Sequence, residues 1–181
     1  MAEATHREIL LVPHLFRASN IHSAARAAEM LQDAGITVRL LEQEQMEVIE
    51  TNPVLSGLTR AAADDDAAAG CELVLVLGGD GTFLRAASYA HAQDIPVLGI
   101  NLGHVGFLAE GEASSLEKVV GQVIDRSYRV VDRMTLDVAV IGDGGEVLGR
   151  SWALNECSIE NSDRSRVLDA TLEVDLSLIH I

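Results

Sequence analysis

Short apolar runs alternate with amphipathic segments over the first 130 residues of the chain. Four runs rich in Val, Leu and Ile are typical of strands buried on both faces: 8–12 (EILLV), 36–41 (ITVRLL), 73–77 (LVLVL) and 95–100 (IPVLGI). Between them lie segments whose apolar residues have the spacing of a helix. This βαβ succession predicts an α/β domain, a parallel sheet with flanking helices and right-handed crossovers, of Rossmann-like type.

Three segments have the apolar spacing of helices: 20–34, 82–93 and 114–126. In the first, we expect Asn20 to cap the helix and Gly35 to end it. In the third, Ser114 and Glu117 have the spacing of a capping box. Residues 42–70 are acidic and Ala-rich, so we expect a loop with a short helix there, and an aspartate run that is solvated rather than bound to a metal.

The hydrophobic pattern changes to a period of two in the last third of the chain. Residues 136–140 and 168–174 alternate, residues 147–154 continue as a strand, and 142–145 carries strong turn residues. We therefore expect an α/β domain over 1–133, followed by the start of an antiparallel all-β domain over 134–181.

A glycine-rich turn, GGDGT, follows the most apolar run. Gly78 and Gly79 are expected to leave the strand in a conformation that a side chain would obstruct, and to expose amide N–H groups. With a helix beginning near Thr82, the turn favours an anion such as phosphate. The Asp80 carboxylate would then hold Mg²⁺ through water or accept a proton from an attacking hydroxyl. The alternative is an ordinary turn in which Asp80 caps the helix.

A second segment, NLGHVGFLAE at 101–110, follows the next strand. Ligands of such sheets bind outside the carboxyl ends of the strands, where both Asn101 and the GGDGT turn fall. Phe107 could stack on a flat base or belong to the core. Further along, Asn155 and Glu156 form a polar pair directly after an apolar stretch of the chain. Taken alone, this pair indicates only a turn.

Composition narrows the class of partner. The 181 residues are 48% hydrophobic and 3% aromatic, with a formal net charge of -15. Nucleic acid and anionic membranes bind basic surfaces, so neither is expected, whereas a nucleotide remains possible. The sequence has no apolar run long enough for a membrane span and no secretory pattern, which indicates a cytoplasmic protein. Cys71 and Cys157 are expected to be buried, reduced thiols, and no Cys/His spacing typical of a metal site is present.

Taken together, these pieces resemble the bacterial NAD kinases, most closely the actinobacterial type. The matching segments are GGDGTFLRAA (78–87), GINLGHVGFLAE (99–110), DRMTLDV (132–138) and WALNECSIE (152–160). GGDGT alone is shared with diacylglycerol and sphingosine kinases. The GGDGT motif followed by the other segments in this order is specific to the NAD kinases.

The resemblance implies Mg²⁺-dependent transfer of the ATP γ-phosphate to the 2′-hydroxyl of the adenosine ribose of NAD, giving NADP. It implies that Asp80 accepts the proton and that Phe107 contacts adenine. The nucleotide-binding residues that it implies are Gly78, Gly79, Asp80, Gly81, Thr82, Arg85, Asn101, Phe107, Asn155, Glu156 and Arg166. No direct metal ligand is implied. A homodimer or tetramer is implied for the full-length protein, and polyphosphate remains an alternative donor.

The resemblance ends at Asp175. The family continues for about a hundred residues beyond that point, so we expect a truncated second domain here, with residues 176–181 not a native continuation, and a fragment that could be inactive. Two alternatives stay open at this stage: a lipid kinase that shares the GGDGT core, and a non-catalytic nucleotide-binding module.

Overall fold

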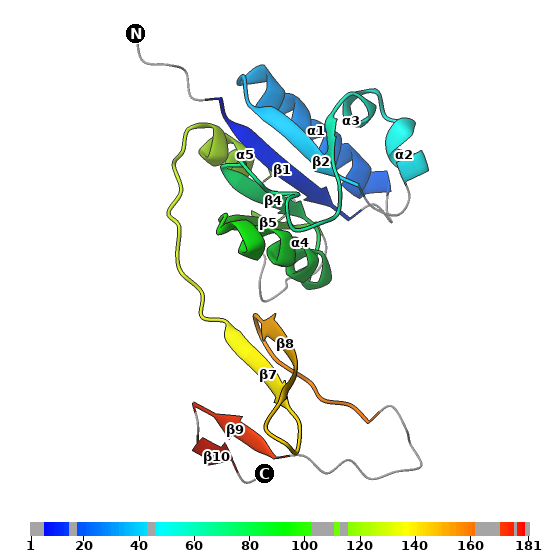
Figure 1. Ribbon diagram of the computed structural model, residues 1–181. Helices are drawn as coiled ribbons and strands as arrows, with labels where there is room; N and C mark the ends of the chain where they lie inside the picture. Colours follow the sequence, from blue (N-terminus) through cyan, green and yellow to red (C-terminus); the bar gives the residue numbers. More distant parts are fainter. Residues whose placement is uncertain are drawn as a thin grey trace. The chain divides into compact units, whose positions relative to one another are not determined.

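The computed structural model describes residues 6–14, 18–42, 46–102, 111–112, 116–161, 171–175 and 177–179. It divides the chain into two units, Met1–Val131 and Asp132–Ile181 (Figure 1). No helix among these residues is long and apolar enough to cross a membrane. The two units are described separately below.

The first unit is built on a parallel sheet, to which the described residues contribute six strands. They are β1 (Glu8–Pro13), β2 (Thr37–Leu41), β3 (Thr59–Ala61), β4 (Leu73–Leu77), β5 (Val97–Asn101) and β6 (Gly111–Glu112). Their order in the sheet is β3-β2-β1-β4-β5-β6, and every neighbouring pair is parallel. This order belongs to the doubly wound folds, in which the direction of winding reverses between the two central strands, here β1 and β4.

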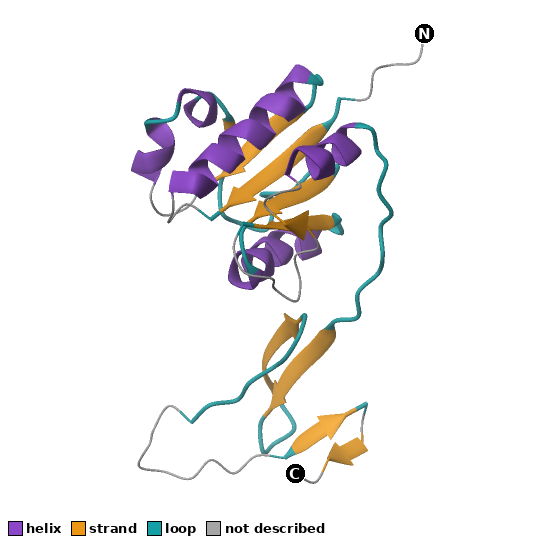
Figure 2. Ribbon diagram, turned by 180° about the vertical axis from the view of Figure 1, so that it is seen from behind, coloured by secondary structure: helices purple, strands orange, loops and turns teal. Residues whose placement is uncertain are grey.

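Helices cover both faces of this sheet (Figure 2). They are α1 (Ala18–Asp33), α2 (Met46–Glu50), α3 (Pro53–Ser56), α4 (Asp80–Gln93) and α5 (Leu116–Ile124). Buried residues of α1, α3 and α5 belong to one hydrophobic cluster, and those of α4 belong to the other. The predicted α/β architecture with a parallel sheet is therefore confirmed.

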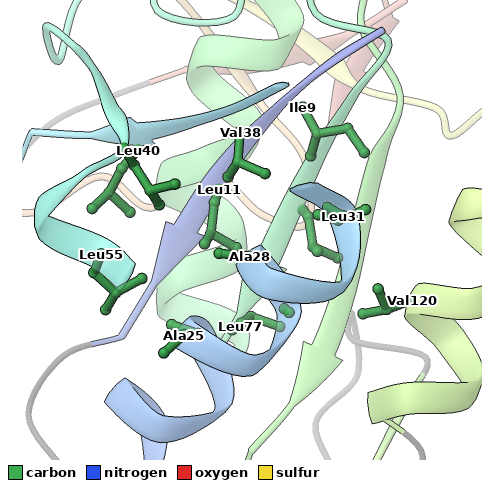
Figure 3. Packing of buried hydrophobic residues seen from close by; sticks show 14 of the residues in the cluster. Ile9, Leu11, Ala25, Ala28, Leu31, Val38, Leu40, Leu55, Leu77 and Val120 are labelled. Atoms are coloured by element: carbon green, nitrogen blue, oxygen red, sulfur yellow. The ribbon is translucent and has the colours of Figure 1, made fainter. Parts of the chain in front are cut away.

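The central strands contribute to both clusters because successive side chains of a strand point to opposite faces. Ile9 and Leu11 of β1 face α1, whereas Leu10 and Val12 face α4. In Figure 3, Ala28 and Leu31 of α1 lie over these strands, and the small alanine side chains allow the helix to approach closely. Full burial of each Leu or Ile contributes about 1.5 to 3 kcal/mol. The core therefore holds β1 and β4, the strands that carry the site, on both sides.

Two sequence predictions for this unit are wrong in part. The region 42–70 contains α2, α3 and the edge strand β3 in addition to loops. Asn20 lies inside α1, which begins at Ala18, and its side chain donates to the His14 carbonyl oxygen instead of capping the helix. Gly35 does follow the end of α1, with a positive φ of 77°.

An ion-pair network ties the amino ends of β1 and β4 to α5. Arg7, just before β1, makes two bonds to the Glu72 carboxylate, at 2.7 and 2.8 Å, and also donates to the carbonyl oxygens of Val123 and Ile124. Arg126 and the Tyr128 hydroxyl donate to the same carboxylate. These donors, Arg7 foremost, lower the pKa of Glu72 to about 2. At this end of the strands, the charged side chains therefore bond to one another.

In the second unit, the described residues form two antiparallel strand pairs. Strands β7 (Leu136–Ile141) and β8 (Val147–Ala153) form a hairpin, and β9 (Leu172–Val174) pairs with β10 (Ser177–Ile179). The predicted antiparallel β structure is confirmed. Cys157, in contrast, is exposed and lies outside a strand, so its predicted burial is wrong; Cys71 is buried, and that burial raises the pKa of its thiol.

Candidate active site

The carboxyl ends of β1 and β4 mark the reversal point of the sheet. The two strands are paired up to Pro13 and Leu77, and the His14 N–H donates to the Leu77 carbonyl oxygen at 2.8 Å, one step beyond. From here β1 leads into α1 on one face, and β4 leads into α4 on the other (Figure 1). Diverging connections of this kind form the crevice in which doubly wound folds bind ligands.

Gly78 is the first residue after β4 and is tightly enclosed. A Cβ atom at this position would lie 2.8 Å from Thr82 Oγ1 and 3.0 Å from His14 Cβ. Its N–H donates to the Ile100 carbonyl oxygen at 3.0 Å, which binds the turn to β5 as well. A side chain would therefore be obstructed at Gly78, as predicted, but the cause is close packing and not the backbone conformation, since its φ is not positive.

Gly79 and Gly81 differ from Gly78. A Cβ atom on either would meet nothing within 4 Å, and neither has a positive φ. For Gly79 the predicted obstruction is therefore wrong. Since no contact with the described residues requires glycine at these two positions, their openness is consistent with backbone that a ligand approaches.

Helix α4 begins inside the turn, two residues earlier than predicted. Gly79 is its N-cap, without a side-chain cap, and its carbonyl oxygen accepts from the N–H groups of Thr82 and Phe83, each at 3.0 Å. Asp80 is the first helical residue, so it does not act as the cap. The first N–H groups of a helix lack intrahelical acceptors and carry the positive end of its dipole. The turn therefore combines a helix start of the kind that favours anions with a half-buried carboxylate.

Three further predicted residues lie in this unit. Thr82 is 7% exposed and packs against Gly78, whereas Arg85 is exposed one turn further along α4. Asn101 ends β5 at the same edge of the sheet and is 5% exposed. Because Gly78 bonds to the residue just before Asn101, the fold brings the turn and Asn101 to neighbouring positions.

The remaining predicted residues lie in the second unit or outside the described residues. Asn155 and Glu156 follow β8 in the second unit, and both are exposed. Phe107 and Arg166 lie outside the described residues. Their joint action with Asp80 stays a prediction.

The sequence interpretation did not place His14 and Asn20 at the reversal point, and it assigned Asn20 only as a helix cap. His14 is half-buried beside Gly78, and Asn20 is 4% exposed in the first turn of α1. The Asn20 amide nitrogen lies 2.9 Å from the His14 carbonyl oxygen and 3.3 Å from Nδ1 of the same residue. The available signal was a histidine directly after a buried strand, but its importance depends on β1 lying next to β4.

A doubly wound α/β domain with a glycine-rich, carboxylate-bearing turn at its reversal point has the features of a nucleotide-binding domain. Comparison with known proteins specifies the family. The profile of the ATP-NAD kinase N-terminal domain matches residues 9–128. The NAD kinase of Corynebacterium efficiens is 63% identical over 175 residues, covering 97% of this chain and 55% of the relative.

Other relatives agree with this match. The NAD kinase of Corynebacterium glutamicum is 63% identical over 82% of the chain and 51% of its own length. That of Rhodococcus opacus is 52% identical over 93% of the chain and 56% of its own length. The chain belongs to the NAD kinase family, and it spans about half the length of the curated relatives it matches.

A solved structure supports the fold. The crystal structure of yeast NADH kinase in complex with NADH superposes with a TM-score of 0.65 at 19% sequence identity, covering 83% of this chain and 47% of that one. At this identity, the similarity concerns the fold alone.

Proposed function

We propose that this chain is the nucleotide-binding part of an ATP-dependent NAD kinase, which phosphorylates the 2′-hydroxyl of the adenosine ribose of NAD to give NADP. In this proposal a nucleotide-binding domain over 1–133 precedes a β domain that begins at residue 134. The enzyme would be cytoplasmic and homo-oligomeric. Family membership favours this activity over a lipid kinase or a non-catalytic module.

The position of Asp80 is the observation that carries the proposal. Its carboxylate belongs to the first residue of α4, at the carboxyl edge of β4, beside the reversal point of the sheet. Gly79 and Gly81 on either side leave the backbone open. A helix start that favours anions is an unusual place for a carboxylate. The arrangement is explained if the helix start binds phosphate while the carboxylate accepts a hydrogen bond from the acceptor hydroxyl.

Asp80 would act as the proton acceptor. A ribose hydroxyl is a weak nucleophile, and most of the catalysis in phosphoryl transfer comes from positioning and from neutralising phosphate charge. Asp80 need only take the proton as the new P–O bond forms. Such assistance accelerates a reaction by roughly a hundred- to ten-thousandfold.

The donor set fits Mg²⁺ brought in by ATP rather than a metal held by the protein alone. No three His, Cys, Asp or Glu side chains form a cluster among the residues that the structure describes. Mg²⁺ in kinases is commonly bound in large part by substrate phosphates, so the ion would reach this site with ATP, and no residue of the chain is assigned as its direct ligand. When bound, the ion would neutralise phosphate charge.

The remaining residues would complete the dinucleotide site. Asn155 and Glu156 would hydrogen-bond the ribose or nicotinamide part, and Phe107 would contact adenine. Arg85, with Arg166, would contact the nucleotide. Asn101, at the end of β5, would bind the nucleotide as well.

An assay of NADP formation tests the proposal. The longest product of the gene is incubated with NAD, ATP and Mg²⁺, beside the 181-residue chain, and NADP is measured with an NADP-specific dehydrogenase. We expect NADP from the longer product, and calorimetric binding of NAD and ATP. Phosphorylation of diacylglycerol or sphingosine in place of NAD would contradict the proposal, as would binding of both nucleotides without turnover by the longer product.

A further inference from the structure

Arg60 is the middle residue of the edge strand β3, and it is partly buried. Its register partner on β2, Leu40, belongs to the hydrophobic cluster that packs against α1, whereas Ala61, the next residue of β3, belongs to the opposite cluster (Figure 3). Since successive side chains of a strand point to opposite faces, Arg60 lies on the α1 face of the sheet. A cation at the margin of an apolar layer is costly unless it is paired.

The guanidinium group of Arg60 lacks a partner. Its Nη1 atom is covered by the protein and forms no hydrogen bond, and among the described residues it is the only buried side-chain nitrogen or oxygen in this condition. None of the ion pairs between described residues includes Arg60. The chain has 28 acidic residues against 13 basic ones, so this arginine is unpaired although carboxylates are plentiful.

Two other arginines of the same unit show what Arg60 lacks. The Nη1 atom of Arg7 donates to a backbone carbonyl oxygen, while Nε and Nη2 both donate to the Glu72 carboxylate. Arg39 has the same arrangement, with Nη1 on backbone carbonyl oxygens and Nε and Nη2 on the Glu8 carboxylate. In Arg60, Nη1 is again the covered atom, whereas Nε and Nη2 are not enclosed and have no oxyanion.

The two remaining donors fit one kind of ligand. A guanidinium group offers parallel N–H donors in a plane, which match two oxygens of a phosphate or a carboxylate. Arg60 lies one residue before the carboxyl end of β3, at the edge of the sheet where β4 also ends in the GGDGT turn. Three strand spacings separate β3 from β4, roughly 14 Å, so an anion on Arg60 occupies a position of its own.

We propose that Arg60 is a phosphate-binding residue of a second anion site, in which Nε and Nη2 donate to two oxygens of one phosphate group. The proposal goes beyond the proposed function, because transfer of a phosphoryl group at the GGDGT turn requires no anion at β3. The phosphate is either free inorganic phosphate or part of a nucleotide that extends from the turn, and the experiment distinguishes these two sources.

The melting temperature of the longest gene product gives the first test. Arg60→Met removes the charge and keeps an unbranched side chain, so in buffer without phosphate the variant should melt about 2 to 4 °C above the wild type. Inorganic phosphate, added at constant ionic strength, should raise the melting temperature of the wild type and leave that of the variant unchanged. Arg129→Met is the matched control, because Arg129 is exposed and lies outside the helices and strands; it should respond as the wild type does.

Calorimetric titration with inorganic phosphate gives the second test. Arg60→Lys keeps the charge but not the pair of parallel donors, so its affinity for phosphate should be about tenfold lower than that of the wild type, the effect of losing one hydrogen bond to a charged group. Equal phosphate responses of the wild type and Arg60→Met would overturn the proposal. If Arg60→Met then also self-associates more strongly, the role of Arg60 is to protect the edge strand.

Titration with ATP assigns the source of the phosphate. Affinity for ATP that falls about ten- to a hundredfold in Arg60→Met places a phosphate of the nucleotide on Arg60. Unchanged affinity for ATP together with a lost phosphate response assigns a separate site for free phosphate, and either result supports the proposal. A wild type that binds neither inorganic phosphate nor ATP would overturn it. These measurements need no turnover, so they still decide the role of Arg60 if the gene product forms no NADP and the proposed function fails.

Discussion

The Thr82 hydroxyl leaves no room for a side chain on Gly78, since a Cβ atom there would lie 2.8 Å from Thr82 Oγ1. The end of β4 and the first turn of α4 are therefore packed against each other without space for another carbon. This contact holds the helix start, and Asp80 with it, at the carboxyl edge of the sheet.

A pair of glycine substitutions separates packing from ligand access in the turn. Gly78→Ala should destabilise the protein by about 1 to 3 kcal/mol, the usual cost of overpacking. Gly79→Ala has open space and an ordinary φ of −90°, so its stability should stay within about 0.5 kcal/mol of the wild type. Urea unfolding measures both. Equal stability of the two variants would contradict the assigned contact.

For ligand binding, the substitution that leaves stability unchanged is the one expected to have an effect. A methyl group on Gly79 would occupy space that we assign to the nucleotide, so Gly79→Ala should bind ATP or NAD more weakly although it is as stable as the wild type. Calorimetric titration of the folded variant measures this. Wild-type affinity for both nucleotides would show that the ligand does not approach this glycine.

Glu72 should make stability depend on pH in the acid range. Its pKa in the folded protein, about 2, is below the ordinary 4.5, so the carboxylate stabilises the fold fully above pH 4.5 and loses that contribution as the pH falls towards 2. Glu72→Gln should cost about 1.5 to 3 kcal/mol near neutral pH, because it weakens charged hydrogen bonds to Arg7. The difference from wild type should shrink on acidification.

Glu117→Gln is the control for that experiment. Glu117 is exposed and 3.9 Å from the likewise exposed Arg26, a geometry that contributes little. Urea unfolding across the acid range measures all three proteins. A difference between wild type and Glu72→Gln that stays constant with pH would contradict the role given to Glu72.

Helix α5 offers a stabilising substitution. Gly121 lies inside the helix, and a Cβ atom added there would meet nothing within 4 Å, so Gly121→Ala should add about 0.5 to 1 kcal/mol. Gly35→Ala is the contrasting variant, because its φ of 77° disfavours any side chain. It should lower stability. Melting temperatures that move in the same direction for both would contradict this explanation.

The sequence predicted the central strands well because each is a continuous apolar run ended by a turn residue. The prediction for β4, residues 73–77, matches the structure residue for residue. It missed β3, whose three residues Thr59, Arg60 and Ala61 have no apolar periodicity. That strand exists because it pairs with β2 at the edge of the sheet, which a local pattern does not encode.

The site was predictable only where its residues are consecutive. GGDGT is recognisable in the sequence, and the structure gives Gly78 a packing reason that the pattern alone could not distinguish from that of Gly79. His14 was missed because its proximity to Gly78 depends on the strand order, which places β1 beside β4. Asn20 has the character of a helix cap locally, but its hydrogen bonds to His14 determine its role.

The rate of Asp80→Asn tests the central claim most directly. Asparagine keeps the size of the side chain and cannot accept the proton from the ribose hydroxyl. In the longest gene product, the variant should melt within a few degrees of the wild type, bind NAD and ATP, and form NADP at least about a hundredfold more slowly. A folded Asp80→Asn enzyme with nearly full activity would contradict the assignment of Asp80 as the proton acceptor.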